Sequence, residues 1–221
     1  MFDISKLALK IPNFLSHEEC DMLINEYEQR QEESNFEGSL NYKTNKHRQS
    51  TFKVVSLIPY TDSFNFIREK TKSAIDTWIN YLSQPQYFFT HSLKNNLKFS
   101  HNYRIMKYET GAEIHPHSDH NIGTFGSISF NLNEDYKGGE FKFFNGNHTI
   151  PLGKGDALIF PADFFWVHEV TKVTKGERYS INSFIRSHPE NILNQGNLLT
   201  NVLSEQYLNT TPPEELLGPY N

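Results

Sequence analysis

The hydrophobic positions near the start of the chain recur at the spacing of a helix. Cys20, Leu23 and Tyr27 fall on one helical face. Ser16 precedes this pattern and Glu19 lies three residues later, which is the arrangement of a capping box. The pattern therefore predicts a helix that begins after Ser16 and buries one face.

Three further segments complete the first part of the chain. Apolar residues recur three or four positions apart over residues 62–83, which predicts a second helix. Residues 31–50 are polar and rich in turn-forming residues, so we expect a loop there, which could cover a substrate or be a plain surface loop. The run of β-branched residues in 51–59 predicts a strand.

After residue 85 the pattern changes to short aromatic or β-branched runs between Gly, Asn and Pro turns. The runs predict strands over residues 99–108, 126–132, 139–144, 157–160 and 179–185. Many short strands of this kind indicate a sandwich, barrel or jelly roll. We expect one domain over residues 1–221, with a helical part at about 1–84, a β core at about 85–186 and an extension, 187–221, whose residues 187–206 form a closing helix.

Composition narrows the class of protein. The 26 acidic and 21 basic residues give a formal charge of -5, whereas a nucleic-acid-binding protein usually has a basic excess. The single cysteine, Cys20, excludes an internal disulfide and a cysteine-rich zinc site. No apolar run approaches the roughly 18 residues of a membrane span, and no secretory signal is visible. We expect a cytoplasmic protein with no nucleic-acid or membrane partner.

A candidate metal site lies in the β region. His117 and Asp119 are two residues apart, which in a strand places both side chains on one side. The chain has three His-x-Asp/Glu pairs, where chance gives about one. The pairs at His17 and His188 lie in a helix cap and a polar connection, but His117 lies among strands with His168 downstream. Two histidines and a carboxylate are the ligands of non-haem Fe(II) oxygenases; the alternative is that His168 is a core histidine.

A candidate anion site follows the second histidine. Arg178 begins a predicted strand, and Ser180 lies on the same side of it. A guanidinium inside a barrel needs an anion, and its planar shape suits a carboxylate. A small dicarboxylic keto acid could chelate a metal at one end and reach Arg178 with the other. The alternative is an ion pair between Arg178 and a buried Asp or Glu.

The segment Tyr108-x-x-Gly111-x-x-Ile114-x-x-His117-x-Asp119 resembles the Y-x-x-G-x-x-Y-x-x-H-x-D signature of prolyl 4-hydroxylase-like, 2-oxoglutarate-dependent Fe(II) dioxygenases. Ile114 departs from the tyrosine of that signature. Further segments agree in order, namely 131–133, 137–141, 151–160 and 176–180, so that the resemblance covers roughly residues 11–186.

The resemblance implies a double-stranded β-helix with the helices packed outside. It implies that His117, Asp119 and His168 bind Fe(II) and act in catalysis, and that Arg178 binds the far carboxylate of 2-oxoglutarate. The further candidate co-substrate contacts are Tyr108, Asn131 and Ser180; Asn131 stands where some relatives have a tyrosine. Oxygen is the second co-substrate, and ascorbate is a candidate reductant.

The implied reaction is hydroxylation of a C–H bond with succinate and CO2 as co-products, and the expected substrate is a prolyl residue of a peptide or protein. Three alternatives stay open. A small-molecule hydroxylase would use the same site. A nucleic-acid base demethylase would show an Arg-x5-Arg pattern, but residue 184 is Phe and the next arginine is Arg186. A β-barrel binding module would have no turnover. The sequence does not predict an oligomeric state.

Overall fold

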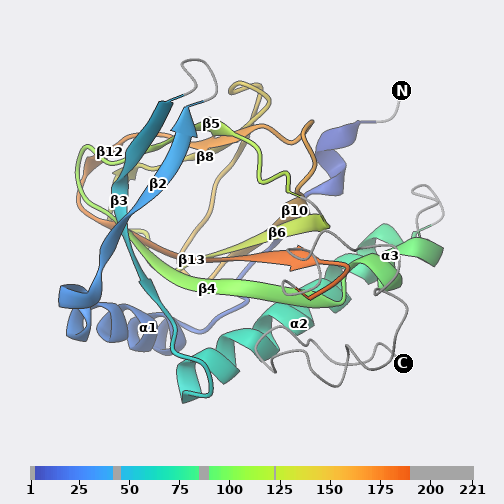
Figure 1. The fold of residues 1–221 in the computed structure, drawn as a ribbon, viewed down its shortest axis with the longest axis horizontal. Helices are drawn as coiled ribbons and strands as arrows, with labels where there is room; N and C mark the ends of the chain where they lie inside the picture. Colours follow the sequence, from blue (N-terminus) through green and yellow to red (C-terminus); the bar gives the residue numbers. More distant parts are fainter. Residues whose placement is uncertain (1–2, 42–45, 85–89, 122, 190–221) are drawn as a thin grey trace.

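The computed structural model describes residues 3–41, 46–84, 90–121 and 123–189. Two antiparallel sheets that face each other form the centre of the fold (Figure 1). The major sheet has the order β1-β10-β6-β13-β4-β3-β2 and the minor sheet has the order β5-β11-β8-β9. A third sheet pairs β12 with β7.

The strands of the major sheet are β1 (Leu9–Ile11), β2 (Asn35–Asn41), β3 (Lys46–Ser56), β4 (Phe99–Tyr108), β6 (Thr124–Asn131), β10 (Ala157–Pro161) and β13 (Arg178–Arg186). Those of the minor sheet are β5 (Ile114–His117), β8 (Phe141–Phe143), β9 (His148–Ile150) and β11 (His168–Val170). The third sheet consists of β7 (Lys137–Gly138) and β12 (Val173–Lys175). The helices are α1 (His17–Gln29), α2 (Asp62–Leu82) and α3 (Thr90–Asn96), with 3-10 turns at η1 (Ile4–Leu7) and η2 (Gln31–Glu33).

Side chains along each strand of the major sheet point alternately to its two faces, so that the sheet has an apolar core on each face. On β10, Leu158 and Phe160 belong to the apolar cluster between the two sheets, whereas Ala157 and Ile159 belong to the cluster under the helices. Figure 1 shows α1 and α2 on the face of the major sheet opposite β5 and β8. This arrangement confirms the predicted jelly roll with helices packed outside.

Both predicted helices are present. Ser16 and Glu19 form the capping box of α1, and Cys20, Leu23 and Tyr27 are its buried residues. The apolar face of α2 is buried against the major sheet, and α2 ends one residue before the predicted limit. No helix in the described part of the chain combines the length and the apolar character that a membrane crossing requires.

The prediction of a loop over residues 31–50 is wrong. After the turn η2, this segment contains β2 and the beginning of β3. The two strands pair with each other as an antiparallel hairpin, and β3 extends the major sheet beside β4. The strand predicted at 51–59 begins earlier and ends at Ser56. With β1, these strands place three members of the major sheet in the part that we expected to be helical, because hydrogen bonding to the sheet requires no apolar periodicity.

The predicted closing helix over 187–206 lies mostly outside the described residues, and its first three residues are not helical. The prediction of a single domain with an extension at 187–221 stays a prediction.

Gly155 holds the segment before α1 against the turn that leads into β10. Its φ is +85°, and a Cβ at this position would lie 2.3 Å from the carbonyl oxygen of Leu15, whose N–H donates to the oxygen of Gly155. Gly146 has a similar φ of +83° but open space around the same position. Gly155→Ala should therefore lower the free energy of unfolding by about 3 kcal/mol or more, and Gly146→Ala by about 1–2 kcal/mol. Urea unfolding of both variants measures the difference; equal losses would contradict a steric role for this contact.

Candidate metal centre

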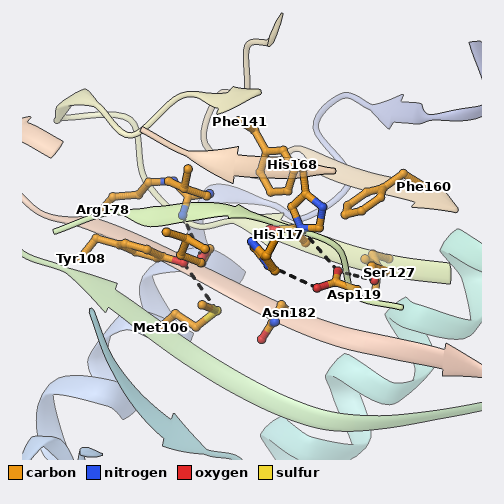
Figure 2. A pocket seen from close by; sticks show the side chains of 15 residues that line it. Met106, Tyr108, His117, Asp119, Ser127, Phe141, Phe160, His168, Arg178 and Asn182 are labelled. Atoms are coloured by element: carbon orange, nitrogen blue, oxygen red, sulfur yellow. Dashed lines mark hydrogen bonds and ion pairs between the residues drawn. The ribbon is translucent and has the colours of Figure 1, made fainter. Parts of the chain in front are cut away.

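The structure brings His117, Asp119 and His168 together in a cavity between the two sheets (Figure 2). Their ligand atoms all lie within 4.8 Å of one another. His117 ends β5 and pairs in register with His168 at the start of β11, so that antiparallel pairing places the two imidazoles side by side. Nε2 of His117 lies 3.4 Å from Oδ1 of Asp119, and Nε2 of His168 lies 3.5 Å from Oδ2.

Backbone carbonyls orient both imidazoles. Nδ1 of His117 lies 2.8 Å from the oxygen of His115, and Nδ1 of His168 lies 3.0 Å from the oxygen of Trp166. A carbonyl oxygen only accepts, so each Nδ1 carries the proton. Each Nε2 is then the acceptor nitrogen of the neutral ring and faces Asp119, which is the arrangement of metal-binding histidines.

Ser127 fixes the carboxylate of the triad. Its hydroxyl donates to Oδ2 of Asp119 at 2.6 Å from the neighbouring strand β6. Burial raises the pKa of Asp119, but His168, His117 and this hydrogen bond outweigh it, so that the pKa lies well below its usual range. Asp119 therefore stays an anion. Ser127 has no sequence motif, and the one available signal was the polar alternation of Ser127, Ser129 and Asn131 along an otherwise apolar strand.

The protein environment shifts the pKa values of the two imidazoles in opposite directions. Burial lowers the pKa of His168 to about 4, although Asp119 opposes the shift. Burial also lowers the pKa of His117, but the contacts with Asp119 outweigh it and the pKa is raised. Without a metal, the carboxylate of Asp119 thus favours the protonated form of His117. Two nitrogens and one oxygen that converge in this way fit the donor set of a non-haem Fe(II) centre.

Arg178 lies at the other end of the cavity and is 1% exposed. Its Nη1 donates to Oγ of Ser180 at 3.1 Å, and its Nε has no hydrogen-bond partner among the residues that the structure describes. None of the carboxylates in the described part of the chain forms an ion pair with it, which argues against the alternative of a structural ion pair. A buried guanidinium without a counterion is costly, so the cavity is complementary to an anion.

The remaining predicted contacts divide into two kinds. Tyr108 lines the cavity with its ring 5.0 Å from the guanidinium carbon of Arg178, and burial raises the pKa of its phenol, so that it stays protonated. Ser180 also lines the cavity. Asn131 does not: its amide donates to the oxygens of Asn133, Leu152 and Gly153 and orders the loop before β10. In this structure Asn131 therefore supports the backbone beside the cavity.

Apolar side chains from both sheets form the walls around the triad. Phe141 stacks on the ring of His168 at 5.3 Å, and Phe160 meets the same ring edge-on at 4.9 Å. Sequence reasoning did not identify the wall residues, which are Met106, Ile114, Phe141, Phe160 and Val170. The ring of His120 meets that of Phe164 edge-on, and His120 is not among the residues that line the cavity.

His101 precedes Arg104 on β4, and its burial makes the stability of the fold depend on pH. Burial, with smaller effects of Arg186 and Arg104, lowers its pKa to about 3. In the unfolded chain the pKa of this histidine is near 6.5, so between pH 3 and pH 6.5 the unfolded chain binds more protons than the folded chain. The free energy of unfolding therefore falls as the pH decreases from 6.5, by up to about 1.4 kcal/mol per pH unit. In His101→Gln this dependence should become shallower between pH 6.5 and 4.5, as measured by urea unfolding. An unchanged slope would contradict the shift.

Comparison with known proteins gives an independent result. Residues 103–186 match the model of the 2OG-Fe(II) oxygenase superfamily. The multifunctional procollagen lysine hydroxylase and glycosyltransferase of Caenorhabditis elegans is 35% identical over 113 residues, which are 49% of this chain and 14% of that protein. The chain spans less than half the length of the curated relatives that it matches.

Two solved structures share the fold. The viral collagen prolyl hydroxylase of Paramecium Bursaria Chlorella virus-1, in complex with 2-oxoglutarate, has a TM-score of 0.58 at 18% identity and covers 81% of this chain and 95% of its own. A prolyl hydroxylase of Trichoplax adhaerens, in complex with a peptide fragment of the hypoxia inducible factor oxygen degradation domain, has a TM-score of 0.61 at 16% identity, over 83% of this chain and 84% of its own.

Residues 103–186 thus match a family whose members use Fe(II), 2-oxoglutarate and O2, and the jelly roll and the convergence of His117, Asp119 and His168 agree with that match.

Proposed function

We propose that this protein hydroxylates a C–H bond of a prolyl residue in a peptide or protein, with 2-oxoglutarate and O2 as co-substrates. The observation that carries the proposal is the buried guanidinium of Arg178, which has no carboxylate partner among the described residues and lies in the same cavity as His117, Asp119 and His168. A metal-binding triad alone fits many reactions. A triad that faces a buried cation selects a ligand with a chelating end and a distant carboxylate, as 2-oxoglutarate has.

Each side chain of the cavity has a role in this proposal. His117, Asp119 and His168 hold Fe(II), which when bound supplies the chemistry that converts 2-oxoglutarate and O2 to succinate and CO2 and adds one oxygen atom to the substrate. Ser127 holds the carboxylate of Asp119 in place. Arg178 binds the far carboxylate of 2-oxoglutarate, and its stack on Tyr108 fixes the direction of the guanidinium. The aromatic walls keep water away from the reacting atoms.

The peptide substrate rests on weaker support than the co-substrate. The prolyl hydroxylase of similar fold in complex with a peptide favours a prolyl residue. The relative named procollagen lysine hydroxylase favours a lysyl residue as the second candidate, because it is 35% identical over half of this chain. The formal charge of -5 gives no support to a nucleic-acid substrate.

The test has two stages. Calorimetry under anaerobic conditions, with Mn(II) in place of Fe(II), should give 2-oxoglutarate binding that depends on the metal. Capped peptides that contain proline or lysine, together with free proline and free lysine, are then compared for succinate release and for a mass increase of one oxygen. Lack of binding at millimolar 2-oxoglutarate by folded protein would favour the binding module. Turnover with free amino acids but not with peptides would favour a small-molecule hydroxylase.

A further inference from the structure

A row of polar side chains crosses three neighbouring strands beside the triad. Asn182 of β13 lies opposite Arg104 of β4 in the strand register and opposite Ser129 of β6. Ser129 and Asn182 line the cavity of the metal-binding triad, and Figure 2 shows Asn182 there, near His117 and Asp119. Side chains at directly opposed positions on one face lie about 5 Å apart at Cβ, so Asn182 and Arg104 are neighbours.

Two polar atoms of this row are buried without a partner. Arg104 is 9% exposed and its Nε has no acceptor, while Oδ1 of Asn182 has no donor, within the part of the chain that the structure describes. The rest of the Arg104 guanidinium is occupied: Nη1 donates to Glu37 of β2, and the ring of Phe184 lies 5.6 Å from its central carbon. A buried donor or acceptor left unpaired costs about 1–3 kcal/mol, so an unpaired donor and an unpaired acceptor on opposed residues indicate a missing ligand between them.

The charges around these two atoms select a neutral ligand. Glu37 already balances the charge of Arg104. An added anion would face the carbonyl oxygen of Asn182 and the carboxylate of Glu37, and an added cation would face Arg104. A trans amide carries one acceptor and one donor and is uncharged. Its oxygen can accept from Nε of Arg104 while its N–H donates to Oδ1 of Asn182.

We propose that Arg104 and Asn182 bind a backbone amide of the peptide substrate and thereby position the substrate beside the metal centre. The inference rests on the proposed function and deepens it, because it names the group of the substrate that these two residues recognise. It assigns the preference for a peptide over a free amino acid to these two residues. Arg178 and Ser180, further along the same face of β13, stay with the co-substrate.

The smallest probe of this site is N-methylacetamide, which has the one donor and the one acceptor of a peptide bond. It is titrated into ¹⁵N-labelled protein with Zn(II) and 2-oxoglutarate, and the signals of the Arg104 Nε–H and the Asn182 side-chain amide are followed. We expect saturable shifts of both signals. N,N-dimethylacetamide keeps the acceptor but lacks the donor, so it should bind about fivefold more weakly, as the loss of one hydrogen bond predicts.

Two variants assign the contacts. In Asn182→Ala the preference for N-methylacetamide over N,N-dimethylacetamide should disappear, whereas the control Asn80→Ala, exposed on α2 on the far side of the major sheet, should keep it. Arg104→Lys keeps the positive charge but lacks the Nε–H, and it should weaken both amides about equally. Equal binding of both amides by the wild type, or no shift at molar concentrations, would mean that the row holds water only and would overturn the proposal.

The two proposals fail in different ways. Binding of 2-oxoglutarate, measured by calorimetry with Mn(II), should be the same in wild type, Asn182→Ala and Arg104→Lys. If 2-oxoglutarate does not bind to the wild type, the proposed function is lost whatever the amides do. If it binds normally and N-methylacetamide does not, the function stands and this inference is wrong.

Discussion

Replacing Asp119 by alanine is expected to abolish both metal-dependent binding of 2-oxoglutarate and hydroxylated product. Asp119 is the anion of the triad, and both imidazoles face it at 3.4–3.5 Å. Its removal leaves two neutral nitrogens, which hold a divalent cation far less tightly. Because loss of a partner that only orients a ligand costs roughly 10–100-fold, loss of the ligand itself should exceed about 100-fold.

The experiment compares three variants for Mn(II) affinity and for product. Ser127→Ala removes the hydrogen bond to Oδ2 but keeps the ligand, so its loss should fall between wild type and Asp119→Ala. Asp76→Ala, on α2 outside the major sheet, is the matched control and should behave as wild type. Circular dichroism checks that each variant is folded. A folded Asp119→Ala protein with full activity would show that the metal centre lies elsewhere.

Replacing Arg178 by alanine is expected to weaken 2-oxoglutarate binding by about 100-fold or more. The guanidinium is 1% exposed and pairs with no carboxylate among the described residues, so a ligand carboxylate bound there would be its main ionic partner. Removing one member of a buried charge pair costs about 3–5 kcal/mol, which corresponds to more than 100-fold in affinity. The metal affinity should change little, because Arg178 does not touch the triad.

Pyruvate sharpens this test because it has the chelating end of 2-oxoglutarate but lacks the far carboxylate. The wild type should bind 2-oxoglutarate much more tightly than pyruvate in the presence of Mn(II), and Arg178→Ala should bind the two nearly equally. Arg68→Ala, on α2, is the control with a guanidinium removed at a distance. If Arg178→Ala still prefers 2-oxoglutarate by the wild-type factor, the far carboxylate lies against another residue.

Local patterns predicted those parts of the fold that depend on local interactions. The capping box of Ser16 and Glu19 and the apolar face of α2 depend on spacing within one helix, so both could be read from the chain. The strand predicted at 99–108 agrees with β4 because both of its faces are buried and carry apolar residues. The hairpin of β2 and β3 was missed because its polar residues depend on pairing with each other and with β4.

The same distinction applies to the candidate site. The spacing of His117 and Asp119 and the resemblance around Arg178 were sufficient to select the side chains that the fold brings together. Ser127 and Asn182 gave only the signal of polar alternation along one strand, because a single polar residue in a strand becomes fully informative only when its neighbours on other strands are known. Asn131 was expected at the co-substrate and instead orders a loop, since a shorter amide at this position reaches the nearby carbonyls.

The pairing of His117 with His168 also determines when the centre can assemble during folding. About fifty residues separate the two histidines in the chain, and the intervening segment contains the strands from β6 to β10. A contact between residues so far apart in the sequence costs chain entropy, which the pairing of other strands must first offset. We therefore expect this contact to form late in folding. In a refolding experiment, metal binding should therefore follow the formation of β structure, and its rate would report when the last step of folding occurs.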